Sequence, residues 1–234
     1  MGRMGSLCAR EFLDDQHSVV IVDPAVSGDS VDGIEMHRKF SDVTGRVDCL
    51  LDVSTPAGVS DSVSAAKTWH CPLAIGTTGL DQATRQAIAD AAKEIPVLIA
   101  PNLSLSVMVM HKLARQAAEM LGEYDIEIVE AHHRNKADAP SGTALSLANA
   151  IATVTKGPIR FNRTGKRQAN EIGIASVRGG GLVGEHEVMF LGDFDSLNIN
   201  LRTNDRRVLA KGAVFFTKQL IAKKPGLWSV EDLA

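Results

Sequence analysis

The densest group of chemically reactive side chains lies in the run EAHHRNKADAPSGTA, residues 130–144. It places His132, His133 and Lys136 just before Ser141, a residue type that often begins helices. A helix N-terminus offers free N–H groups and a positive dipole end, so this run predicts a site for a carboxylate or phosphate. A histidine beside that site can transfer a proton near neutral pH. The alternative is a solvated surface loop in which Ser141 only caps a helix.

Two loops of small residues follow apolar, strand-like runs. GTTG (residues 76–79) comes directly after CPLAI (71–75), and APNLS (100–104) overlaps the end of PVLIA (96–100). Ligands of parallel sheets bind beyond the carboxyl ends of the strands, and small residues there let a cofactor approach the backbone. The alternatives are a tight turn for the first loop and a domain linker for the second.

An acidic residue, Asp23, ends the first visible strand-like run, VVIV (residues 19–22). An acid in that position typically binds the ribose hydroxyls of NAD and repels the 2′-phosphate of NADP. Pro24 and Ala25 follow it, and neither is basic. The alternative is a solvated acid at a strand end.

The remaining histidines and cysteines predict no metal site and no nucleophile. Adjacent histidines on extended backbone point to opposite sides, and no second pair has ligand spacing. Cys49 and Cys71 lie within apolar strands, and Cys8 lies near the start of a predicted helix at 6–13, so we expect packing roles. For His186 we expect a hydrogen-bonding role in a strand.

The composition excludes several classes of protein. Of 234 residues, 44% are hydrophobic and 23% charged, as in soluble globular proteins, and the net charge is −3 with 4% aromatic residues. A nucleic-acid binder would be basic and rich in stacking aromatics, so we expect no nucleic-acid partner. No apolar run approaches a membrane span, no signal peptide is visible, and three cysteines form no disulfide framework. We therefore expect a cytoplasmic protein without a membrane partner.

The first part of the chain alternates apolar runs with helical patterns, which predicts a doubly wound parallel sheet. Strands are expected at 19–22, 47–52, 71–75 and 96–100, and helices at 57–68 and 81–94, the latter capped by Asp81.

The pattern changes after residue 104 to that of an α+β domain with a largely antiparallel sheet. Helices are expected at 105–121 and 141–154, and strands at 126–131, 172–178, 182–191 and 197–202. Residues 156–171 are polar and predict a mobile loop. A final helix, 206–222, is expected to pack back on the first domain. The expected domains are thus residues 1–104 with 206–234, and 105–205.

The run 130–144 resembles the signature of the dihydrodipicolinate reductase (4-hydroxy-tetrahydrodipicolinate reductase) family, and the resemblance extends from residue 2 over almost the whole chain. Supporting matches are GTTG (76–79), APNLS (100–104), SVRGG (176–180), VGEH (183–186) and KPGL (224–227). The resemblance implies a two-domain, usually tetrameric enzyme of the diaminopimelate route to lysine. A Rossmann-like domain binds NADH or NADPH, and an inserted α+β domain binds the dicarboxylate substrate and forms the oligomer core. The reaction passes a hydride to the substrate ring and releases water.

The resemblance also assigns residues. It makes His132 and Lys136 the catalytic proton-transfer residues and leaves open which one donates. It assigns substrate contacts to His133, Ser141, Gly142 and Thr143. It assigns cofactor contacts to Arg3, Met4, Asp23, Gly76, Thr77, Thr78, Ala100, Pro101, Asn102 and Leu103. With Asp23 and no adjacent base, NADH is expected to be slightly favoured, and no metal is expected.

The chain departs from the family pattern at two places. The family begins V-x-I-x-G-x-x-G-R-M-G, whereas this sequence begins inside that motif at MGRMG, so the first strand is missing. Three explanations stay open: a longer native chain, which we expect, a real truncation that binds cofactor weakly, or a relative with only its central domain intact. The second departure is DVSTP (52–56), where many relatives carry Asp-Phe-Thr.

Two other functions remain as alternatives. One is a non-catalytic relative that only binds a dicarboxylate. The other is an oxidoreductase of similar fold that uses a nucleophilic cysteine, such as a semialdehyde dehydrogenase.

Overall fold

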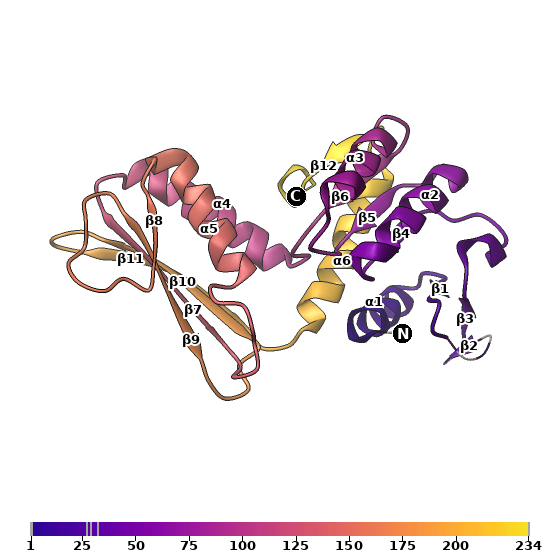
Figure 1. Cartoon of the computed structure of the whole chain (residues 1–234), viewed down its shortest axis with the longest axis horizontal. Helices are drawn as coiled ribbons and strands as arrows, with labels where there is room; N and C mark the ends of the chain where they lie inside the picture. Colours follow the sequence, from indigo (N-terminus) through magenta and orange to yellow (C-terminus); the bar gives the residue numbers. More distant parts are fainter. Residues whose placement is uncertain (1, 27, 29, 32, 234) are drawn as a thin grey trace. The chain divides into compact units, whose positions relative to one another are not determined.

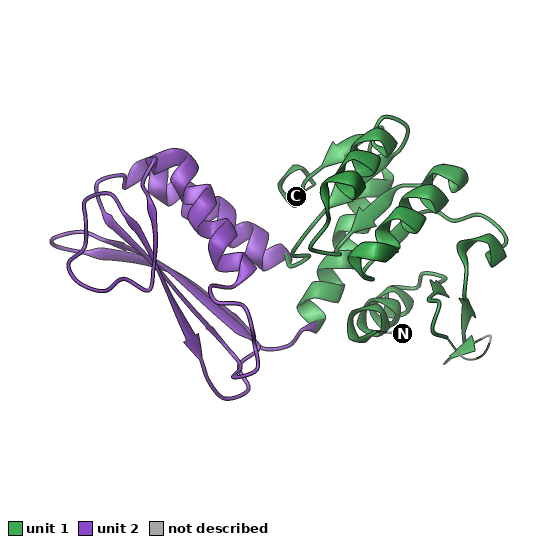
Figure 2. Ribbon diagram, viewed as in Figure 1, with its two compact units in different colours: residues 1–104, 207–234 green, residues 105–206 purple. Residues whose placement is uncertain are grey.

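The computed structural model describes residues 2–26, 28, 30–31 and 33–233, which form two compact units (Figures 1 and 2). Unit 1 comprises Met1–Ser104 and Arg207–Ala234, and unit 2 comprises Leu105–Arg206. Met1 and Ala234, the outer limits of the first expected domain, lie outside the described residues.

Unit 1 contains a parallel sheet with strand order β12-β6-β5-β4. Its strands are β4 (Leu50–Asp52), β5 (Leu73–Ile75), β6 (Pro96–Ile99) and β12 (Gly226–Trp228). All three residues of β5 are fully buried, as expected for a strand covered on both faces. The carboxyl ends of β4, β5 and β6 therefore lie at one edge, where the loops after these strands begin.

The helices of unit 1 pack on this sheet and on one another. They are α1 (Arg3–Asp14), α2 (Val59–Trp69), α3 (Gln82–Ala91) and α6 (Arg207–Ile221), with short 3-10 turns at Phe40–Asp42, Pro56–Gly58 and Val230–Asp232. The Asp81 side chain caps α3 by accepting a hydrogen bond from the Thr84 N–H at 2.7 Å, as the sequence predicts. Helices α2 and α3 form a common apolar core with β4–β6, and α6 contacts β5, β6 and α1.

A second, smaller sheet in unit 1 has the order β1-β3-β2. Its strands are β1 (Val20–Val22), β2 (Ser30–Val31) and β3 (Ile34–His37). The sequence analysis missed β2 and β3, because runs this short carry no clear alternation. In the part of the chain that is described, β1 pairs with β3 and not with the larger sheet. Strand β4 is the edge strand of that larger sheet, so the parallel strand pairs of unit 1 belong to two sheets.

Unit 2 is a five-stranded sheet with the order β11-β10-β7-β9-β8, and helices α4 and α5 lie along one face of it (Figure 1). The strands are β7 (Asp125–His132), β8 (Ile159–Phe161), β9 (Ile172–Arg178), β10 (Gly184–Leu191) and β11 (Ser196–Thr203); the helices are α4 (Leu105–Met120) and α5 (Gly142–Thr155). The sheet is mixed rather than largely antiparallel, because β9 runs parallel to both β7 and β8. Long connections from β7 to β8 and from β8 to β9 make those parallel pairs possible.

The segment 156–171, expected as a loop, contains the short strand β8 and several charge pairs. The guanidinium groups of Arg163 and Arg167 both bind the Glu127 carboxylate on β7, and Arg163 also binds Glu171 at 2.5 Å. The segment is therefore not a loop throughout, because Ile159–Phe161 form β8, and its arginines bind one carboxylate on β7 and one, Glu171, at its own end.

In the described part of the chain, no helix is long and apolar enough to span a membrane.

Candidate active site

Strand β7 delivers the two central side chains of the site. Its burial alternates along the strand, and Glu130 and His132 lie on the same inward side because they are two residues apart. The Glu130 side chain is fully buried, and the His132 side chain is 11% exposed. His132 is the last residue of β7, so its nearly buried side chain lies next to the loop that follows the strand.

The Glu130 carboxylate binds three residues: one on its own strand, one on β9 and one at the start of α5. It accepts hydrogen bonds from the Arg178 guanidinium at 2.7 and 2.9 Å, from the Ser141 N–H at 3.1 Å, and lies 2.6 Å from His132 Nδ1. Burial alone raises the pKa of Glu130, but the bonds from Arg178, His132 and Ser141 outweigh it and lower the pKa to about 2. Glu130 is therefore an anion that holds β7, β9 and the start of α5 together.

His132 is held in one orientation and in its neutral form. Burial lowers its pKa, Glu130 opposes that effect, and the nearby cations Lys136 and Arg178 lower the pKa further. With Nδ1–H donated to the Glu130 carboxylate, Nε2 carries the lone pair. A Cβ atom at Gly184 would lie 3.0 Å from this Nε2, so a residue without a side chain leaves the nitrogen room.

Helix α5 begins at Gly142, one residue after Ser141. The Ser141 hydroxyl accepts the Ala144 N–H at 3.2 Å and lies 3.0 Å from His186 Nε2, and Ser141 is 2% exposed. Ser141 therefore uses its polar groups inside the protein. Gly142 is exposed, with open space where a side chain would be, so the first turn of α5 faces outward there.

His186 on β10 is a buried histidine behind this site. Its ring lies 5.2 Å from the His132 ring, edge to face. Burial lowers its pKa to about 4, and the nearby His132 adds to the effect. It is therefore neutral at physiological pH. The sequence analysis expected a strand histidine with a hydrogen-bonding role, and the contact with Ser141 provides that bond.

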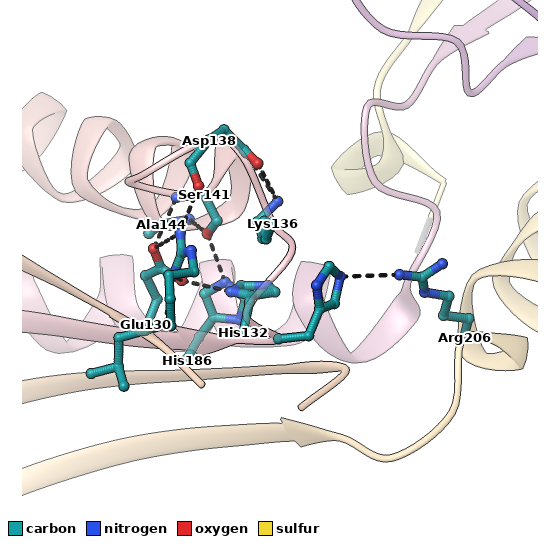
Figure 3. A network of polar contacts seen from close by, with 11 residues as sticks. Glu130, His132, Lys136, Asp138, Ser141, Ala144, His186 and Arg206 are labelled. Atoms are coloured by element: carbon teal, nitrogen blue, oxygen red, sulfur yellow. Dashed lines mark hydrogen bonds and ion pairs between the residues drawn. The ribbon is translucent and has the colours of Figure 1, made fainter. Parts of the chain in front are cut away.

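The loop between β7 and α5 carries Lys136, whose ammonium group lies 2.7 and 2.9 Å from the two carboxylate oxygens of Asp138. The Lys136 bond lowers the pKa of Asp138. Figure 3 shows Glu130, His132, Ser141 and His186 joined by polar contacts, with Lys136 and Asp138 paired on the neighbouring loop. His133 Nε2 lies 3.3 Å from the Arg206 guanidinium.

Sequence reasoning missed Arg178 as a site residue. It lies opposite His132 in the parallel β7–β9 register, and it also donates to the Asp138 carbonyl at 2.6 Å. The signal was present in the run SVRGG at the end of a predicted strand, but only the strand pairing places its side chain beside Glu130.

The residues expected to bind the cofactor lie in unit 1. Gly76, Thr77 and Thr78 follow β5, and Ala100, Pro101, Asn102 and Leu103 follow β6. A Cβ atom at Gly76 would lie 3.0 Å from Leu103 and 3.2 Å from Val53, so the loops after β4, β5 and β6 touch one another. Their position beyond the carboxyl ends of parallel strands fits a pyridine nucleotide.

The other expected cofactor residues lie near the smaller sheet and the first helix. Asp23 follows β1 and accepts a hydrogen bond from the Ala25 N–H at 2.9 Å. Arg3 and Met4 begin α1, whose N-cap residue Gly2 provides no side-chain cap. An uncapped helix N-terminus is a suitable neighbour for a phosphate group.

The three cysteines do not fit the role of a nucleophile. Burial raises the pKa of Cys8 and of Cys71 to about 11, and it raises the pKa of Cys49 as well. A thiol with a raised pKa forms little thiolate at neutral pH. Within the described residues, no cluster of three His, Cys, Asp or Glu side chains is arranged to hold a metal ion.

The chain matches two family models that together cover nearly all of it. "Dihydrodipicolinate reductase, N-terminus" matches residues 1–103, and "Dihydrodipicolinate reductase, C-terminus" matches residues 106–234.

Similar proteins with curated names agree with these matches. A 4-hydroxy-tetrahydrodipicolinate reductase of Cupriavidus metallidurans is 41% identical over 86% of this chain and 79% of its own length. A 4-hydroxy-tetrahydrodipicolinate reductase of Caldanaerobacter subterraneus is 36% identical over 99% of this chain and 94% of its own length.

Solved structures show the same architecture. A dipicolinate-bound dihydrodipicolinate reductase from Paenisporosarcina sp. TG-14 superposes with a TM-score of 0.82 at 25% identity, covering 97% of this chain and 94% of that one. An amine dehydrogenase from Mycobacterium smegmatis superposes with a TM-score of 0.69 at 10% identity, covering 99% and 93%, which shows a shared fold.

Proposed function

The chain belongs to the dihydrodipicolinate reductase family, and on that premise we propose how its residues carry out the reaction. The enzyme is an oxidoreductase of the diaminopimelate route to lysine that reduces 4-hydroxy-tetrahydrodipicolinate with a pyridine nucleotide and releases water. The Glu130–His132 pair beside Lys136 and the start of α5 is the observation that carries the assignment of roles.

Unit 1 is the cofactor-binding domain in this proposal. The loops 76–78 and 100–103 hold the nicotinamide side, Arg3 and Met4 lie near the phosphates, and Asp23 binds the ribose. When bound, the reduced nucleotide supplies the hydride. The Asp23 carboxylate would repel a 2′-phosphate, so NADH is slightly favoured over NADPH.

Unit 2 is the substrate-binding domain. A dicarboxylate needs cations and N–H donors, which His133, Lys136 and the Gly142–Thr143 turn of α5 supply. The dipicolinate named in the similar structure from Paenisporosarcina is a dicarboxylate of this kind. Ser141 takes the role of a positioning residue here, because its hydroxyl and N–H are bound to groups of unit 2.

Lys136 donates the proton in this proposal, and His132 orients the substrate. His132 is neutral with its lone pair on Nε2, which makes it an acceptor for a proton or a hydrogen bond. The Lys136 ammonium carries the proton that the substrate nitrogen or carbon needs as negative charge develops on the ring. Asp138 holds that ammonium beside the site until substrate binds.

Replacing the donor tests this division of roles. We expect Lys136→Ala to lower kcat by ~10²–10⁴, the usual contribution of a general acid. Lys156→Ala is the matched control, because Lys156 is an exposed lysine of the same unit whose ammonium donates to the Thr153 carbonyl at the end of α5. His132→Ala should lower kcat within the same range. A change below about threefold for Lys136→Ala would remove it from the donor role.

We also propose that the enzyme is a homotetramer acting in the cytoplasm. The face of the unit 2 sheet opposite α4 and α5 supports the oligomer: Val129 and Ala131 on β7 pair with Ala175 and Val177 on β9, and Val177 is 48% exposed. A sheet face of this kind is a suitable surface for a second copy of the chain.

A further inference from the structure

A buried carboxylate, Asp52, lies beneath the loops that are proposed to bind the cofactor. Asp52 is the last residue of β4 and is 3% exposed. It is the first residue of the DVSTP run, and neither the expected nor the proposed site includes it.

Four donors from three segments converge on Asp52. Oδ1 accepts the Ser54 N–H at 3.1 Å, the Ser54 hydroxyl at 2.9 Å and the Thr77 hydroxyl at 2.6 Å. Oδ2 accepts the Ser62 hydroxyl at 2.5 Å. Charge-assisted hydrogen bonds of this length are among the stronger ones in proteins. Asp52 therefore connects the loop after β4, the loop after β5 and helix α2.

The connected segments are closely fitted to one another. The Gly76 N–H donates to the Asp52 carbonyl at 2.8 Å, and an added Cβ at Gly58 would lie 2.9 Å from the Ser54 hydroxyl oxygen. A movement of the Asp52 side chain would therefore displace both Ser54 and Thr77, whose loops have little free space to take up the change.

We propose that Asp52 is a positioning residue that fixes the cofactor-binding loops of unit 1 through Ser54 and Thr77, with Ser62 as the anchor of the carboxylate on helix α2. The inference rests on the proposed cofactor site. It adds that cofactor affinity depends on a hydrogen bond made by Ser62, a buried side chain that is itself no part of that site.

Ser62→Ala is the direct test, with Ser64→Ala as its matched control. Both serines lie on α2, but the Ser64 hydroxyl is exposed and donates to the Ser60 carbonyl of its own helix. Loss of the Ser62 bond leaves one oxygen of Asp52 without a donor in the described structure. Hydrogen bonds to charged groups contribute enough free energy that loss of this one should weaken NADH binding about tenfold.

The measurements are NADH affinity by fluorescence titration, binding of pyridine-2,6-dicarboxylate by calorimetry, and the melting temperature, each on the full chain. We expect Ser62→Ala to weaken NADH about tenfold, to raise KM for NADH more than it lowers kcat, and to leave dicarboxylate binding unchanged. Ser64→Ala should bind NADH like the wild type. Asp52→Asn, which replaces an acceptor oxygen with a donor, should weaken NADH at least as much.

Three results would overturn the proposal. Wild-type affinity for NADH in Ser62→Ala would show that the bond does not position the loops. Equal weakening in Ser62→Ala and Ser64→Ala would assign the effect to general destabilisation of α2. Failure of the wild type itself to bind NADH, with dicarboxylate binding intact, would remove the proposed cofactor site and this inference with it.

Discussion

His186 makes the stability of unit 2 sensitive to mild acid. The histidine is buried and neutral, with a pKa near 4, whereas an unfolded histidine has a pKa of ~6.5. Because the folded pKa is the lower one, the unfolded chain binds the proton first as the pH falls. The contribution of His186 is fully present above pH ~6.5 and is lost progressively down to its folded pKa.

The size of the effect follows from the two pKa values. Between pH 7 and pH 5, the unfolded histidine gains about 0.7 of a proton and the folded one gains about 0.1, which gives a loss of about 2 kcal/mol in the free energy of unfolding. His132, whose pKa is also lowered by burial, changes stability in the same direction. Glu130 acts at lower pH, because its contribution is lost between the pKa of an unfolded glutamate, ~4.3, and its folded pKa of about 2.

Urea unfolding of the wild type and His186→Gln at pH 7 and pH 5 measures this contribution. Glutamine keeps a donor for the Ser141 hydroxyl but does not titrate. Both tryptophans, Trp69 and Trp228, lie in unit 1, so their fluorescence follows unit 1 while far-ultraviolet circular dichroism follows the whole chain. We expect the variant to lose about 2 kcal/mol less than the wild type between the two pH values. Equal losses would refute the neutral, buried state assigned to His186.

Three further predictions concern the chemistry and the assembly. Gly184→Ala places a Cβ 3.0 Å from His132 Nε2 and should lower kcat about tenfold with little change in NADH affinity; an unchanged kcat in steady-state assays would contradict the role of that nitrogen. Asp23→Asn should reduce the ratio of kcat/KM for NADH to that for NADPH, and a wild-type KM lower for NADPH would refute the stated preference. Light scattering should give the mass of a tetramer, and Val177→Arg on the open sheet face should reduce it; a wild-type monomer would remove the proposed assembly.

Sequence patterns predicted the elements with strong periodicity and missed those that depend on pairing. The helix at 105–121 and the strand at 172–178 agree closely with α4 and β9, because each has a long apolar repeat. Strand β8 was missed because its few residues, Ile159–Phe161, lie in a polar segment. The alternation of buried and exposed side chains along β9 does not reveal which strand it pairs with or in which direction. The parallel pairing of β9 with β7 therefore could not be predicted.

The same distinction applies to the site. His132, Lys136 and the start of α5 were visible as a cluster in one short run of sequence. Arg178 and His186 reach Glu130 and Ser141 only through strand register, from positions more than 40 residues further along the chain. Asp52 ends the predicted strand 47–52, but the sequence analysis gave it no role, because its convergence with Ser62 and Thr77 depends on how α2 and β5 pack.

Oxidation of NADH by this 234-residue chain tests the central claim most directly. The substrate is generated in the assay by condensation of pyruvate with aspartate semialdehyde. The controls are reactions that lack pyruvate and reactions that lack aspartate semialdehyde. Substrate-dependent loss of NADH absorbance, slowed at least about a hundredfold by Lys136→Ala and retained by Lys156→Ala, is the result that the account predicts. A folded wild-type protein that binds both NADH and pyridine-2,6-dicarboxylate, yet oxidises no NADH above the controls, would contradict it.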